Sequence, residues 1–128
     1  WSSDVCSSDL RETVPKQFDD RTLYVHNDQI TLMRTTPEEC AALGREVGEK
    51  LSAATGPTAL FIPLKGVSMI AVEGGPFHDA AADEALFDAV RGACGSNVEV
   101  IELDLDVNDP AFSQAMADWL SAQLEATA

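Results

Sequence analysis

The feature that most constrains the fold of this chain is an uninterrupted apolar run at its centre. Residues 58–64 read TALFIPL. A run of this length and composition is typical of a β-strand that is covered on both faces, as the strands of parallel sheets are. The run therefore predicts a central strand in an α/β sheet.

A helix is expected before this strand. Thr36, Pro37 and Glu39 place a capping hydroxyl, a proline at the first helical position and a glutamate at the third, which is the capping-box arrangement. Gly56-Pro57 stops the helix. Its apolar positions recur every three or four residues at Cys40, Leu43, Val47, Leu51 and Ala54.

The second half of the chain repeats the alternation. Residues 82–94 have helical spacing and end at Gly95, which suits a left-handed cap. Residues 97–103 indicate a strand, and Asp109-Pro110 opens a last helix. The face of that helix is formed by Phe112, Ala115, Met116, Trp119, Gln123 and Leu124. This order predicts an α/β fold with a Rossmann-like partial parallel sheet and flanking helices.

The N-terminal part has a different character. Residues 22–26 and 29–33 predict two short strands. Residues 1–10 repeat Ser-Ser-Asp without apolar periodicity and resemble translated adapter sequence, so we interpret them as a non-native head. We expect residues 11–128 to form one C-terminal domain of a two-domain protein, truncated at its N-terminus.

Charge and composition narrow the class of partner. The formal net charge of −14 opposes nucleic acid and the anionic membrane surface, so neither is an expected partner. No signal peptide or apolar run of about 20 residues occurs, which predicts a cytoplasmic protein. The three cysteines lack CxxC spacing, and Cys40 and Cys94 are interpreted as small buried thiols.

Lys65-Gly66-Val67-Ser68 follows the apolar strand and is the first candidate ligand-binding segment. Ligands of open α/β sheets bind outside the carboxyl ends of the strands. Glycine permits close backbone approach, Lys65 supplies a point charge for a phosphate or carboxylate, and Ser68 supplies a hydroxyl. The alternative is a solvated lysine beside a turn glycine.

Residues 73–79 form the second candidate segment. Gly74 and Gly75 make turns, and His78 could act as acid or base with Asp79 or Glu73. A histidine beside an aspartate is also a common orienting or helix-capping pair. With no clear third and fourth ligand, no metal is predicted.

Two further pairs complete the predicted site. His26-Asn27 at a strand end could hydrogen-bond a ligand or simply form a turn. Arg34-Thr35 precedes the helix N-terminus, where free N–H groups and the dipole favour an anion.

Three motifs together resemble a known family. YVHNDQITLMRTTPEE, PLKGVSMIAVEGGPFHD and NDPAF occur here in that order. They are similar to the C-terminal half of the Tm-one-like ATP-binding family, an uncharacterised protein family that includes the tomato mosaic virus resistance protein. This chain has Asp28, Ala71 and Asp106 where the family pattern has a proline, an acid and a histidine.

The resemblance implies a Rossmann-like domain that binds ATP, another nucleotide or a small anionic ligand together with an N-terminal domain of the same polypeptide. A hydrolase or lyase-like enzyme using His78 is the first alternative. A protein-interaction or homo-oligomerisation module is the second. We expect Lys65, Ser68, Glu73 and His78 to face one cleft.

Overall fold

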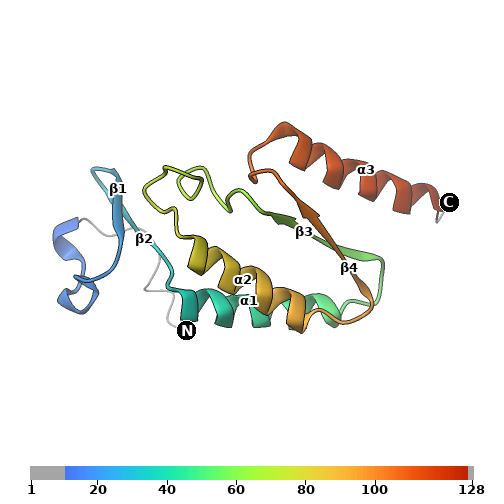
Figure 1. Cartoon of the computed structure of the whole chain (residues 1–128), viewed down its shortest axis with the longest axis horizontal. Coiled ribbons are helices and arrows are strands. Elements are labelled where there is room, and N and C mark those ends of the chain that lie inside the picture. The colour runs from blue at the N-terminus through green and yellow to red at the C-terminus, as the bar shows by residue number, and fades with distance from the viewer. Residues whose placement is uncertain (1–10, 127–128) are drawn as a thin grey trace. The chain divides into compact units, whose positions relative to one another are not determined.

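The computed structural model describes residues 11–126 (Figure 1). The chain divides after Thr35 into two compact units, a division that the sequence did not predict. The interpretation of residues 1–10 as a non-native head lies outside the described residues. No helix of residues 11–126 is both long enough and apolar enough to cross a membrane.

The first unit is built on a β-hairpin. Two short 3-10 helices, Arg11–Thr13 and Lys16–Phe18, precede it. Strands β1 (Leu23–Asn27) and β2 (Ile30–Met33) pair antiparallel, which confirms the two predicted strands. The Asn27 side chain accepts a hydrogen bond from the amide of Gln29 at 2.9 Å across the turn.

Helix α1 (Pro37–Ser52) opens the second unit with the predicted capping box. The Thr36 hydroxyl accepts from the Glu39 amide at 3.2 Å, and the Glu39 carboxylate accepts from the Thr36 amide at 2.8 Å. Two amides that have no partner within the helix are satisfied in this way, which contributes about 1 kcal/mol. The helix ends before Ala54, which the apolar spacing had included.

A strand–helix–strand unit follows. Strands β3 (Thr58–Pro63) and β4 (Val98–Leu103) pair in parallel, with Thr58 opposite Val98, and α2 (Ala80–Ala93) connects them. The parallel pairing confirms the predicted α/β fold.

Alternate side chains of β3 face different helices, because successive residues of a strand point to opposite faces. Ile62 forms the core with Phe87 and Val90 of α2. Phe61 meets Phe112 of α3 (Pro110–Ala126) edge to face, with ring centroids 6.4 Å apart. Helices therefore cover both faces of the β3–β4 pair (Figure 1).

Glycines of α1 set its closeness to α2. A Cβ on Gly44 would lie 2.5 Å from the Leu86 carbonyl oxygen, and one on Gly48 would lie 2.6 Å from the Ala93 Cβ. The two helices therefore approach at a distance that only glycine permits.

Four sequence-based interpretations differ from the structure. β3 pairs with β4 alone, so within the described residues it is an edge strand and not a central one. Gly95 is not a left-handed cap, because α2 ends at Cys94 in an extended conformation. On α3, Phe112 is buried, whereas Met116 and Leu124 are exposed. Both earlier errors on coverage arise because apolar spacing does not reveal which neighbours are present.

The cysteines separate in the same way. Cys40 is buried, as expected, whereas Cys94 is only partly buried. Burial nevertheless raises the pKa of the Cys94 thiol, which disfavours the reactive thiolate.

Candidate functional site

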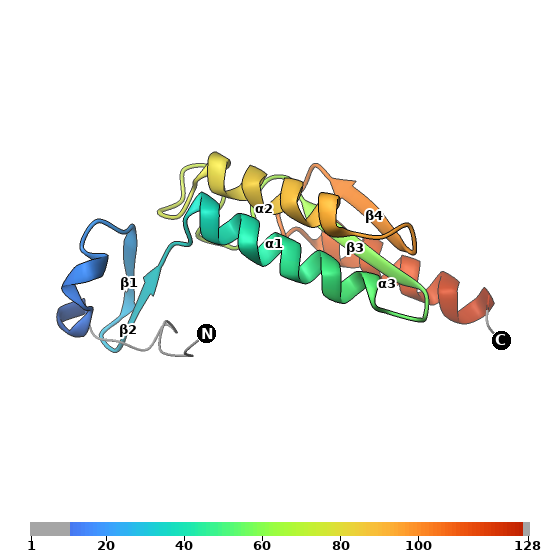
Figure 2. The same cartoon turned by 90° about the horizontal axis from the view of Figure 1, so that it is seen from below.

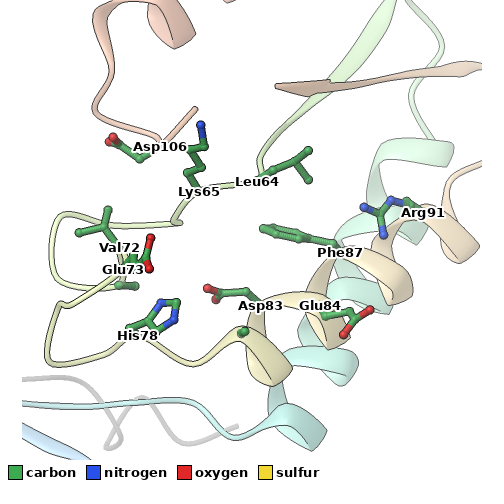
Figure 3. A pocket seen from close by; sticks show the side chains of 12 residues that line it. Leu64, Lys65, Val72, Glu73, His78, Asp83, Glu84, Phe87, Arg91 and Asp106 are labelled. Carbon is green, nitrogen blue, oxygen red and sulfur yellow. The ribbon is translucent and has the colours of Figure 1, made fainter. Parts of the chain in front are cut away.

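A cavity of about 740 Å³ lies beside the carboxyl end of β3 (Figure 3). The loop of residues 64–79 forms one wall, and the first turns of α2 form another. Asp106, in the loop after β4, contributes a third side. The lining residues are Leu64, Lys65, Ala71, Val72, Glu73, His78, Ala80, Asp83, Glu84, Phe87, Arg91 and Asp106.

Backbone pairing beyond the strands fixes the start of this loop. The amide of Lys65 donates to the Leu105 carbonyl at 3.0 Å, and the amide of Val107 donates to the Gly66 carbonyl at 3.0 Å. Gly66 has a φ of 146°, in the region that favours glycine. The β3 and β4 exits are thus joined, and the backbone of Lys65 is held at the cavity.

Internal hydrogen bonds hold the rest of the loop. The amide of Phe77 donates to the Ile70 carbonyl at 2.8 Å, and the amide of His78 donates to the Gly75 carbonyl at 3.1 Å. A Cβ on Gly75 would lie 2.5 Å from the Ile70 oxygen, so this turn needs glycine. With Phe77 buried beneath it, the loop carries the exposed His78 at the cavity wall.

The two cations at the cavity already have carboxylate partners. Lys65 Nζ lies 2.8 Å from Asp104 Oδ2, and these side chains are 60% and 79% exposed. Arg91 lies between two carboxylates, 2.6 Å from Asp88 and paired also with Glu102. An exposed pair such as the first contributes only about 0–1 kcal/mol, so Lys65 can exchange its partner at little cost.

Carboxylates outnumber cations around the cavity. The acidic lining residues are Glu73, Asp83, Glu84 and Asp106. Even so, residues 11–126 contain no group of three or more His, Cys, Asp or Glu side chains arranged to hold a metal ion. The local potential is therefore negative, and Lys65 is the positive group best placed to exchange its partner for a ligand.

The structure brings three of the predicted site residues together. Lys65, Glu73 and His78 all line the cavity, as Figure 3 shows. Ser68 is not among the lining residues, and neither are Gly66, Gly74 and Gly75, whose roles above are in shaping the loop or its turns.

Asp79 has a structural position. Its carboxylate accepts a hydrogen bond from the amide of Ala82 at 3.0 Å and caps α2. The capping alternative weighed for the His78–Asp79 pair is therefore the one observed for Asp79. Of the two acids considered beside His78, Glu73 is the one at the cavity.

The remaining predicted residues belong to the first unit. His26 lies in β1 with its ring 6.3 Å from that of Tyr24, and Asn27 accepts within the hairpin turn. Arg34 donates to the Thr35 hydroxyl at 3.0 Å. Their role in ligand binding stays a prediction.

Sequence reasoning missed the contribution of α2 to the cavity. Asp83, Phe87 and Arg91 recur every four residues, which places them along one face of the helix. That spacing was visible, but Phe87 was absorbed into the expected core. The missing information was where the helix passes the exit of β3.

The parallel β3–β4 pair, the helices on both its faces and a cavity at the strand exit define an α/β domain of the ligand-binding type. The sequence profile described as "Uncharacterised protein family (UPF0261) C-terminal domain" matches residues 2–124. The chain belongs to this family. The match begins inside the segment that we interpret as a foreign head, and that interpretation stays a prediction.

Curated relatives support the assignment. A UPF0261 protein of Rhizobium meliloti is 52% identical over 106 residues, which cover 81% of this chain and 27% of the relative. A UPF0261 protein of Clostridium tetani is 46% identical over 115 residues, covering 89% and 28%. The chain thus spans little more than a quarter of the length of these relatives.

A more distant relative comes from a plant. The ToMV resistance protein Tm-1 of Solanum lycopersicum is 32% identical over 110 residues, which cover 84% of this chain and 15% of the plant protein. The resemblance drawn from the three motifs is therefore confirmed at the level of the UPF0261 C-terminal domain.

Proposed function

We propose that this domain forms part of a binding site for a nucleotide or another anionic small molecule, at the cavity beside the carboxyl end of β3. The observation that carries the proposal is the meeting of Lys65 and His78 at one cavity of about 740 Å³. Pockets for small ligands have volumes of about 300–1,000 Å³. In open α/β sheets they form at this end of the strands.

Lys65 is the proposed anion contact. Its backbone is fixed by the hydrogen bond to Leu105, whereas its ammonium is held only by the exposed pair with Asp104. A phosphate or carboxylate could replace Asp104 as the partner, because an exposed ion pair stabilises the folded state little. Arg91, held by two carboxylates, is less available.

The excess of carboxylates bears on the form of the ligand. An ionised polyphosphate entering beside Glu73, Asp83 and Asp106 meets repulsion that Lys65 alone does not offset. A nucleotide complexed with Mg²⁺ carries less negative charge, and Mg²⁺ is commonly held by one or two carboxylates together with substrate phosphates. We therefore expect Mg²⁺ to strengthen nucleotide binding.

An enzymatic role is the second candidate. Glu73 and His78 line the same cavity, which places an imidazole and a carboxylate beside one ligand. Groups of these types perform general acid–base chemistry when a substrate lies within hydrogen-bonding reach. In a hydrolase or lyase-like reaction, the pair would be His78 with Glu73, since Asp79 caps α2.

A thermal-shift screen of the longer polypeptide and of this chain tests the proposal. Ligand at about 100 times its dissociation constant stabilises a protein by about 2.7 kcal/mol, so ATP with Mg²⁺ is expected to raise the melting temperature by several degrees. Sodium chloride at equal ionic strength is the control. The proposal fails if neither nucleotides nor other small anions raise the melting temperature beyond that control. Turnover of a bound ligand would favour the enzymatic candidate.

A further inference from the structure

The outer edge of β3 carries backbone groups that no strand of residues 11–126 pairs with. The amide of Leu64, directly after β3, donates to the Leu103 carbonyl at 2.9 Å. Alternate residues of a strand turn their amides to the same side. The even-numbered amides of β3 therefore point to β4, and the amides of Ala59 and Phe61 point away from it.

Helix α1 presents an apolar stripe without a strand beneath it. Gly44 contacts α2, and Arg45 lines the groove between the two helices on their outer side. At about 100° per residue, Val47 and Leu51 lie on the other flank of Gly44, toward the sheet layer. Val47 is 42% exposed there. Figure 2 shows α1 on the β3 side of α2, with β4 on the other side.

Helix α3 presents a second stripe from the opposite face. Phe112 packs on β3, and Trp119 Nε1 donates to Glu99 of β4 at 2.7 Å. Helical geometry places Met116 and Leu120 on the flank of Phe112 that turns away from β4. They are 39% and 54% exposed. Both helices thus direct apolar side chains to the space beside the outer edge of β3.

We propose that this space is a strand-binding slot, and that its occupant is an apolar β-strand running parallel to β3. A strand at the next position in a sheet lies about 4.8 Å away and pairs with the edge amides, which a helix cannot do. Apolar stripes above and below require an occupant that is apolar on both faces, as parallel strands are. The edge amides of Ala59 and Phe61 fix its position.

The strand comes from a longer polypeptide of the same chain. Curated relatives extend far beyond the matched region, which is 27% of the length of the Rhizobium meliloti protein. An intramolecular strand also pairs without the translational cost of association. A second copy of this chain is the competing occupant, and the experiment below separates the two.

Amide hydrogen exchange, read residue by residue in this chain and in the longer polypeptide, tests the proposal. The amides of Ala59 and Phe61 are expected to exchange rapidly in the chain alone and at least about 100-fold more slowly in the longer polypeptide. The amide of Ile62, which points to β4, is the internal control and stays slow in both. Rapid exchange of Phe61 in both proteins would overturn the proposal.

Two other results would also overturn it. Slow exchange of Phe61 that appears only as the concentration of the chain rises would identify a second copy as the occupant. Slow exchange at every concentration would mean that the chain covers this edge by itself. Val47→Glu provides an independent check, since it should leave the chain alone unchanged and raise the unfolded fraction of the longer polypeptide at least about tenfold. Met69→Glu, at an exposed loop position, is the matched control.

Discussion

Replacing Phe112 with alanine is expected to lower the free energy of unfolding by about 3–4 kcal/mol. Phe112 is the one buried residue of α3, 3% exposed, and its ring meets Phe61 edge to face. The substitution removes this aromatic pair and leaves a cavity between α3 and the strand pair. Urea denaturation followed by circular dichroism measures the loss.

Met116→Ala is the matched control for Phe112→Ala. Met116 lies four residues further along α3 and is 39% exposed. Its truncation removes far less buried surface, so a cost below about 1 kcal/mol is expected. Equal costs for the two variants would show that α3 is not anchored through Phe112.

Gly44→Ala is expected to destabilise the protein by about 2–3 kcal/mol, although alanine is the better helix former. The added Cβ would lie 2.5 Å from the Leu86 carbonyl oxygen. This atom belongs to the α2 backbone, so the clash can be relieved only by moving one helix from the other. The same denaturation experiment measures the loss.

Gly92→Ala separates packing from helix propensity. Gly92 lies inside α2, and a Cβ there would meet nothing within 4 Å. This variant should therefore gain up to about 1 kcal/mol from the improved propensity. If Gly44→Ala were also stabilising, the close approach of α1 to α2 would be wrong.

Local chemistry made most of the secondary structure predictable. The order of Thr36, Pro37 and Glu39 specifies a helix start through hydrogen bonds among neighbouring residues, and the structure shows those bonds. Asp109 likewise accepts from the Ala111 amide at 2.8 Å at the start of α3. Such signals need no knowledge of distant neighbours.

Burial was less predictable because it depends on what lies beside each element. The apolar run at residues 58–64 does form a strand, but only one of its edges is paired. Met116 and Leu120 follow the apolar spacing of α3 and are nevertheless exposed. Helical spacing identifies an apolar face but not the part of it that a neighbour covers.

The candidate site was predicted in part for a related reason. Lys65, Glu73 and His78 share one loop, and the rule for strand exits placed that loop correctly. Asp83 and Arg91 were missed because they come from a helix whose position relative to the loop is set by tertiary packing. The engagement of Lys65 by Asp104, from the loop after β4, was hidden for the same reason.

Titration calorimetry of wild type and Lys65→Ala in the longer polypeptide tests the proposed function most directly. The probe is ATP with Mg²⁺, or the small anion that gives the largest thermal shift. Loss of the charged contact is expected to weaken binding by about 1–3 kcal/mol, which is roughly 5- to 150-fold, with the fold intact.

Lys50→Ala is the control for this titration, because Lys50 is an exposed lysine of α1 paired with Glu46 and lies outside the cavity. Its affinity for the probe should equal that of the wild type. The account predicts weakened binding for Lys65→Ala alone. Equal affinities in all three proteins, or the same loss in both variants, would contradict it.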